Sequence, residues 1–403
     1  MNHQRLIVTA VCLVIILVWI GFLHANPSYS VDSLSPVRLV RDTHETENVY
    51  YTRSSPLAAG EMPYTTAPQE YPILSVLYIS MPRLFTDYPE TFTAILSAIN
   101  AAILVCAVVV SSHLLSILGV SYHRLWLFLF PATLYFTFNR FDILMVGVIL
   151  ASLMFLFRGK FWWAIVFLLV GFFIKWFSIF LVPVYFLYQR NQVSQDQWKR
   201  DIKLGCVLVF GSLAVITTVL FVLAGEESLY PYLLHTQRGI EYGSTFSPAF
   251  AWLLVHLSPA AYRYTRDTTA AVLSTLQLGL PVLMLIFAGR FARFVKTRED
   301  VLRWSLIVIA VFLLFAKFYS PQFVLWFLPL ALLFSKTWKD VLLLGILDVV
   351  HYVSFPLVFD GFGEASNMYA VAALVRGLLL AVLIYRLVKP LSIRWFSPTL
   401  HSA

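Results

Sequence analysis

Long apolar segments separated by short polar connectors run along almost the whole chain. A transmembrane helix needs about 20 consecutive apolar residues, and about 17 or fewer suffice where a helix is broken or lines a cavity. The pattern therefore predicts an all-α polytopic membrane protein with about twelve spans, built as a single integral-membrane domain over residues 1–403. The expected spans lie at 6–24, 92–117, 124–137, 143–157, 161–174, 176–188, 204–224, 270–288, 305–317, 322–335, 341–358 and 369–387.

Two segments outside the spans are too long to be simple connectors. Residues 25–91 follow the first span, and residues 225–269 follow the seventh. Loops longer than about 12–15 residues are usually functional. The apolar stretch 246–257 within the second loop predicts a helix at the membrane interface. Both loops are expected on the extracytoplasmic face.

The composition agrees with a lipid environment. Of the 403 residues, 60% are hydrophobic and 12% are charged, whereas a soluble domain carries about 25% charged residues. Most Lys and Arg residues lie in short connectors, which predicts that these connectors and both chain termini lie on the inner side of the cytoplasmic membrane. The net charge of +8 is therefore a topology signal, and the expected partner is a bilayer, not nucleic acid.

Four cations interrupt the apolar pattern, namely Arg140, Lys175, Arg238 and Lys317, and the predicted topology places all four at the outer face. A charge at membrane depth is costly and normally faces a protein interior or a wet cavity. For any one of them, extension of the side chain to the lipid headgroups is an equally good explanation, and Arg140 could pair with Asp142. As a set they predict a pocket for an anion such as phosphate.

Acidic side chains provide candidates for proton transfer. Asp348 and His351 lie one helical turn apart on the eleventh span, either as a mutually hydrogen-bonded structural pair or as a catalytic pair. The carboxylates of the first loop fit a solvated acidic loop, but one of them could remove a hydroxyl proton from an acceptor. They are Asp32, Asp42, Glu45, Glu47, Glu61 and Glu70.

Several motifs are absent from the sequence. It contains no Walker loop, Gly-rich dinucleotide fingerprint or nucleophile elbow, and no His/Cys cluster with metal-ligand spacing. These absences argue against an ATP-driven pump and a Rossmann-type enzyme, and we expect neither a metal nor a cofactor. A transporter or a flippase would also need basic groups in a cavity. Transporters often contain inverted repeats, and none is found here, so an enzyme is favoured.

Five segments resemble, in order, motifs of the GT-C superfamily of polytopic glycosyltransferases, and are closest to the GT87 (DUF2029) group. The sequence Lys-Phe-Tyr-Ser-Pro-Gln-Phe-Val-Leu-Trp is similar to the most specific of these motifs, K-x-x-S-P-Q-[YF]-x-x-W. The others are similar to G-x-x-P-Y…E-Y-P, N-R-[FY]-D, A-x-K-x-[YF]-P and R-x-[IL]-x-[IL]-[ED]-S. In chain order the five segments are 60–72, 139–144, 174–176, 238–244 and 317–326.

The resemblance implies a polyprenyl-phosphate sugar donor, typically carrying mannose or another hexose. The sugar would pass with inversion to a lipid- or glycan-linked acceptor on the extracytoplasmic face. The four cations would bind the donor phosphate, and His351 is added as a candidate contact from the eleventh span. The remaining expected substrate-binding residues are Asn139, Asp142, Glu241, Ser320, Gln322, Glu70 and Tyr71.

The resemblance also indicates where the base should lie. The family usually places an Asp a few residues before a Tyr, and this chain has Glu47 there, ahead of Tyr50. Glu for Asp is a departure, because the additional methylene moves the carboxylate by about one bond length. Asp42 is the second candidate and Asp32 the third. Because a phosphate leaves readily without a general acid, one base suffices.

Overall fold

The regular elements of the described structure are all helical, which confirms the predicted all-α class. The computed structural model describes residues 3–25, 40–42, 44–65, 69–237, 239–241, 243–246, 249, 256–290, 295–335, 337–363 and 367–396.

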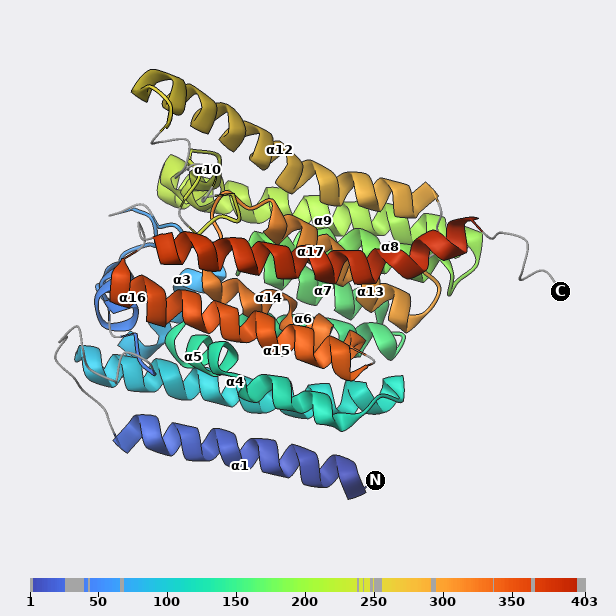
Figure 1. The fold of residues 1–403 in the computed structure, drawn as a ribbon, viewed down its shortest axis with the longest axis horizontal. Helices are drawn as coiled ribbons and strands as arrows, with labels where there is room; N and C mark the ends of the chain where they lie inside the picture. The colour runs from blue at the N-terminus through green and yellow to red at the C-terminus, as the bar shows by residue number, and fades with distance from the viewer. Residues whose placement is uncertain are drawn as a thin grey trace.

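The long helices lie side by side with their axes roughly parallel (Figure 1). The first residues of α1 (His3–Ala25) and the last of α17 (Asn367–Phe396) lie at one end of this bundle. The short helices α3 (Ile73–Ser80), α10 (Tyr230–Gln237) and α16 (Phe359–Phe362) lie at the opposite end. The N-terminal end of α1 and the C-terminal end of α17 therefore lie at the same end of the bundle.

Five described helical segments are long and apolar enough to cross a membrane, and a sixth span is possible if one bent pair of helices is counted. The chain is thus a multi-pass membrane protein by helix length and composition, and the count of twelve spans stays a prediction. Besides α1 and α17, the long apolar segments contain α4 (Pro89–Leu118), α9 (Gln195–Ala224) and α15 (Trp338–Tyr352).

The difference in span count arises from short helices in the middle of the bundle. The expected span 124–137 is a 3-10 helix, Tyr122–Leu129, followed by α5 (Pro131–Asn139). Pro131 lacks an N–H and so favours the first turn of a new helix. The expected span 176–188 is divided between the 3-10 helix η5 (Trp176–Phe180) and α8 (Leu181–Arg190).

α13 (Arg298–Leu314) and α14 (Val324–Phe334) lie in the core, and α9 lies at its surface. α13 and α14 are buried over most of their length. α9, in contrast, exposes large apolar side chains such as Val207 and Val222. A helix that is apolar on its outer surface requires lipid around it, so the core helices are enclosed by protein and the outer helices by the bilayer.

The two long loops contain helices of their own. The first loop holds the π-helix η2 (His44–Tyr50), α2 (Tyr51–Ala58) and α3. Within the predicted second loop, 225–269, the helix α12 (Pro259–Arg290) already begins at a proline. Most of the predicted interfacial helix at 246–257 lies outside the described residues.

Candidate active site

A polar cavity of about 190 Å³ lies between the first loop and the breaks in the core helices. Its residues come from six separate stretches of the chain, so the fold assembles it from segments far apart in sequence. The lining residues are Glu45, Glu70, Tyr71, Pro72, Arg140, Lys175, Trp176, Pro231, Leu234, Phe318, Ser320, Gln322, Phe323 and Trp326.

One wall of the cavity is a sharp break in a helix. α5 and α6 (Ile143–Phe157) meet at 106°, and Arg140 at the break has extended backbone angles, φ −135° and ψ 155°. The break leaves the Arg140 carbonyl without a helical partner, and the Asn100 side-chain amide donates to it at 3.0 Å. Irregular backbone at membrane depth is tolerated where such groups are satisfied or line a cavity.

Arg140 is the centre of the polar network. Its guanidinium forms an ion pair with Asp42 at 2.5 Å and donates from Nε to the side-chain oxygen of Gln322 at 2.7 Å. Both Arg140 and Asp42 have side chains only 8% exposed. A buried charge pair with further hydrogen bonds has one well-defined geometry, so Arg140 is held in a fixed orientation at the cavity wall.

Asn139 attaches the first loop to this network. Its side-chain amide donates to the Val40 carbonyl at 2.9 Å, and its side-chain oxygen accepts from the Asp42 N–H at 2.9 Å. The Asn139 side chain is thus both a donor and an acceptor toward the backbone of the first loop. Asn139 is therefore a structural residue that positions Asp42 beside Arg140, and it is not among the lining residues.

Lys175 lies in an aromatic cage. Its ammonium is 4.4 Å from the ring centroid of Phe141, 5.0 Å from that of Tyr71 and 5.7 Å from that of Trp326. The Asp142 carboxylate is 3.6 Å away and also accepts from the Trp326 indole N–H at 2.7 Å. Asp142 is fully buried and pairs with Lys175, whereas the sequence offered Arg140 as its alternative partner.

Glu45 is one of the two described first-loop acids that line the cavity, the other being Glu70. The Glu45 side chain is 19% exposed, accepts from the Tyr71 hydroxyl at 3.3 Å and lies 4.0 Å from the Arg140 guanidinium. Its N–H donates to the Asp42 carboxylate at 3.1 Å. Asp42 followed three residues later by Glu45 is a helix N-terminus pattern, and this signal could have identified Glu45 from the sequence.

The other expected acids are placed differently. Glu47 is half-buried and does not line the cavity. Burial, together with the charge of Glu90, raises the pKa of Glu47, while Arg41 opposes the shift. Glu70 does line the cavity, but it forms an ion pair with Arg53 at 2.5 Å. Asp32 lies outside the described residues.

Two of the four predicted cations, Arg140 and Lys175, line the cavity. Lys317 is buried in the connector between α13 and the 3-10 helix Pro321–Phe323, and its carbonyl accepts from the Glu241 N–H at 3.0 Å. Ser320 and Gln322 of the same motif line the cavity, while Lys317 and Glu241 do not. Arg238 lies outside the described residues.

Asp348 and His351 each have a separate structural partner. The Asp348 carboxylate accepts from the N–H groups of Ala132 and Thr133 at 2.8 and 3.0 Å, and so caps the first turn of α5. His351 is hydrogen-bonded to the Tyr319 hydroxyl at 2.8 Å. The structure places His351 outside the cavity lining, so it does not contact a ligand held there.

The cavity therefore combines two fixed cations, the carboxylates of Glu45 and Glu70, of which Glu70 pairs with Arg53, and several aromatic rings. Each lining cation already has a carboxylate beside it, so the site is a charge-balanced network and not a cluster of bare positive charge. Among the described residues no group of three His, Cys, Asp or Glu side chains could hold a metal ion. The arrangement can bind an anionic group and, next to it, accept a proton.

An all-helical, multi-pass membrane protein with a polar cavity between broken helices is the class that this fold and this site define. A family model described as glycosyltransferase family 87 matches residues 70–316, which is more than half of the chain. The chain therefore belongs to glycosyltransferase family 87 and is a membrane glycosyltransferase. The comparison with curated proteins gave no match. The match includes the Arg140 break and Lys175, but neither the first-loop acids Asp42 and Glu45 nor Lys317.

Proposed function

We propose that this glycosyltransferase moves a sugar, mannose or another hexose, from a polyprenyl-phosphate donor to a hydroxyl of a lipid- or glycan-linked acceptor. The observation that supports this donor most directly is an apolar groove that lies next to the polar cavity. A lipid-linked phosphosugar has a charged head and a long hydrocarbon tail, and the molecule offers one compartment for each.

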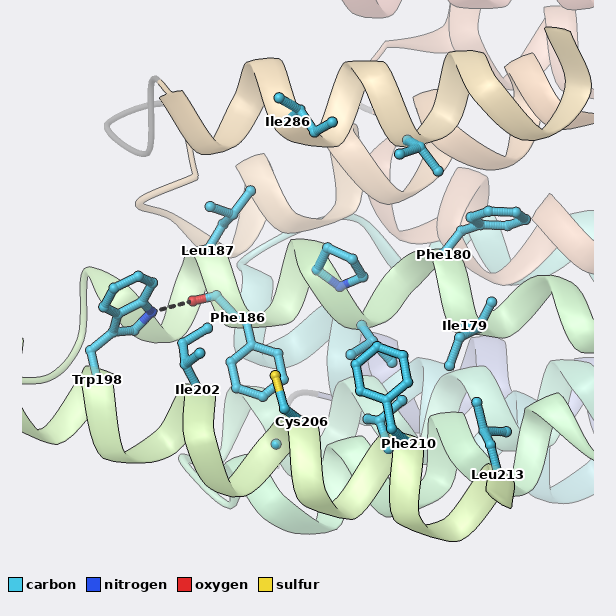
Figure 2. A pocket seen from close by; sticks show the side chains of 15 residues that line it. Ile179, Phe180, Phe186, Leu187, Trp198, Ile202, Cys206, Phe210, Leu213 and Ile286 are labelled. Carbon is cyan, nitrogen blue, oxygen red and sulfur yellow. Dashed lines mark hydrogen bonds between the residues drawn. The ribbon is translucent and has the colours of Figure 1, made fainter. Parts of the chain in front are cut away.

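The groove runs between α8, α9 and α12 and has a volume of about 520 Å³ (Figure 2). Figure 2 shows Ile202, Cys206 and Phe210 of α9 facing α8, with Ile286 of α12 on the far side. The indole N–H of Trp198 in the wall donates to the Phe186 carbonyl at 3.3 Å. The groove surface is almost entirely apolar, as a hydrocarbon chain requires.

The short helix η5 connects the two compartments. Trp176 at its start lines the polar cavity, and Ile179 and Phe180 line the groove. The rings of Trp176 and Phe180 are in contact, with centroids 6.1 Å apart. A phosphate beside Lys175 could therefore continue into a tail along the groove, where each buried CH₂ adds about 0.8 kcal/mol.

The proposed reaction is a single displacement at the anomeric carbon. Glu45 takes the proton of the acceptor hydroxyl, whose oxygen bonds to the anomeric carbon while the bond from that carbon to the phosphate oxygen breaks. The products are the glycosylated acceptor and polyprenyl phosphate, with inverted configuration. Arg140 and Lys175 stabilise the charge that develops on the leaving phosphate, and Asp42 and Gln322 keep Arg140 in place.

We also propose that the cavity faces the extracytoplasmic side and that both chain termini lie on the inner side of the cytoplasmic membrane. The basic stretch 189–203 supports this orientation, because it comprises the end of α8, the turn to α9 and the start of α9, at the end of the bundle where α17 ends (Figure 1). Positive charge in short loops marks the cytoplasmic face.

Purified protein in liposomes should transfer radiolabelled mannose from polyprenyl-phosphate mannose to an added lipid or glycan acceptor, with release of polyprenyl phosphate. Donors with glucose or a pentose on the same lipid test the choice of sugar. Movement of the labelled donor across the bilayer without transfer to any acceptor would contradict the proposal and indicate a flippase instead.

Narrowing the groove should weaken binding of long-chain donors selectively. We expect Cys206→Trp to raise the KM for a long-chain donor roughly tenfold, about 1.4 kcal/mol, because the indole would occupy space needed by the tail. The KM for a donor with two isoprene units should change little. Cys106→Trp is the matched control, since Cys106 is also exposed but lies on α4, away from the groove. Equal KM changes with both donors would contradict the proposed tail site.

A further inference from the structure

A fully buried arginine, Arg376, projects from α17 toward the loops beside the cavity. It donates to the carbonyls of Gly243 and Tyr319, at 3.3 Å to the latter, and its guanidinium lies 3.9 Å over the Tyr319 ring. Tyr369 is also hydrogen-bonded to it. No ion pair between described residues involves Arg376. Carbonyl dipoles and a π face therefore stabilise a cation that is costly to bury.

The two carbonyls belong to two segments that pack tightly against each other. The Glu241 N–H donates to the Lys317 carbonyl and the Ser244 hydroxyl donates to the Ala316 carbonyl, both at 3.0 Å. A β-carbon on Gly243 would lie 2.6 Å from the Tyr319 carbonyl oxygen, so this approach requires glycine. Arg376 bridges both backbones through the carbonyls of Gly243 and Tyr319.

Tyr319 is also fixed from α15. His351 Nδ1 lies 2.6 Å from the Leu347 carbonyl, which can only accept, so Nδ1 carries the proton. Nε2 is then the acceptor for the Tyr319 hydroxyl. Tyr319 is thus held by α15 through its hydroxyl and by α17 through its ring and carbonyl. Its two neighbours in sequence, Phe318 and Ser320, line the cavity.

We propose that Arg376 is a positioning residue for the active site. It holds residues 241 and 243–244 against segment 316–320 and so fixes the cavity wall formed by Phe318 and Ser320. Arg376 does not line the cavity and acts through Tyr319. It also lies outside the matched residues 70–316, so the family match alone does not identify it. The expected effect of Arg376 on the transfer rate rests on the proposed function. Its expected effect on the packing of the two segments does not.

The test uses the full-length protein in nanodiscs and two variants, Arg376→Gln and Gly243→Ala. Hydrogen exchange should show the amides of Glu241 and Ser244 exchanging at least tenfold faster in both, while those of α17 stay protected. In the transfer assay, kcat should fall roughly 100-fold, the scale expected for a displacement of about 1 Å, with a smaller change in KM. Arg376→Lys should recover part of the loss, because it keeps the charge but not the planar fork.

Arg386→Gln is the matched control, since Arg386 lies on the same helix and pairs with Asp340 at 2.7 Å; its loop exchange and kcat should equal the wild type. Unchanged amide exchange in Gly243→Ala, or faster exchange with normal kcat, would overturn the inference. If Arg376→Gln fails to fold, Gly243→Ala decides, because it leaves Arg376 intact. A wild-type protein without transfer would contradict the proposed function, while the exchange data would still test the bridge made by Arg376.

Discussion

Glu45→Gln should abolish most of the transfer activity while leaving donor binding intact. A general base contributes about 10²–10⁴-fold to the rate, so kcat should fall by that order. Gln has nearly the same size and can still accept from the Tyr71 hydroxyl that bonds Glu45, so the cavity should keep its shape. The measurements are kcat in the transfer assay and donor affinity in the absence of acceptor.

Three further variants make this test specific. Glu61→Gln changes an exposed acid of the same loop and should behave as the wild type. Glu47→Gln should retain activity because Glu47 does not line the cavity. If Glu45→Gln kept its full rate and Asp42→Asn lost it, the base would be Asp42. Loss of activity in Glu47→Gln alone would identify Glu47 as the base, as the sequence predicted.

The sequence predicted the fold class and the places where the chain must break. Arg140, Lys175 and Lys317 each interrupt an apolar run, and each lies between two short helices in the structure. Charges and helix breaks coincide for a physical reason. At membrane depth, both a charged side chain and irregular backbone are tolerated where they face a cavity or the protein interior. Of these three interruptions, Arg140 and Lys175 line the cavity and Lys317 does not.

The pairing of charges could not be predicted in the same way. Asp142 is two residues from Arg140 in sequence, but the 106° bend separates their environments, and Asp142 pairs with Lys175. Arg140 instead pairs with Asp42, about a hundred residues earlier. Such contacts depend on how the first loop folds over the helix ends, and local spacing contains no information about that.

The choice of base was limited by the same problem. In a helical turn, residues two apart face different directions, so Glu45 and Glu47 cannot both face the cavity. Sequence position alone favoured Glu47. The hydrogen bond from the Glu45 N–H to the Asp42 carboxylate determines where the turn begins, and so which side chains face the cavity. The capping pattern that begins at Asp42 was the available signal, and it points to Glu45.

Arg140→Gln should lower kcat/KM by about 10²–10³, the range expected when one preorganised stabiliser of developing charge is lost. The same change leaves Asp42 buried without its partner, which costs about 3–5 kcal/mol of stability. The double variant Arg140→Gln/Asp42→Asn separates the two effects, because neutralising both partners removes the unpaired charge. Its thermal unfolding temperature should return toward the wild-type value while transfer stays low.

Arg83→Gln is the control for removing a first-loop arginine, since Arg83 pairs with Asp87 and lies over the Tyr51 ring, away from the cavity lining. Its kcat/KM should be normal. Recovery of transfer in the double variant would show that Arg140 serves the fold and not the leaving phosphate. If transfer stays low in a well-folded double variant, Arg140 stabilises the leaving phosphate. This interaction becomes stronger as the sugar–phosphate bond breaks.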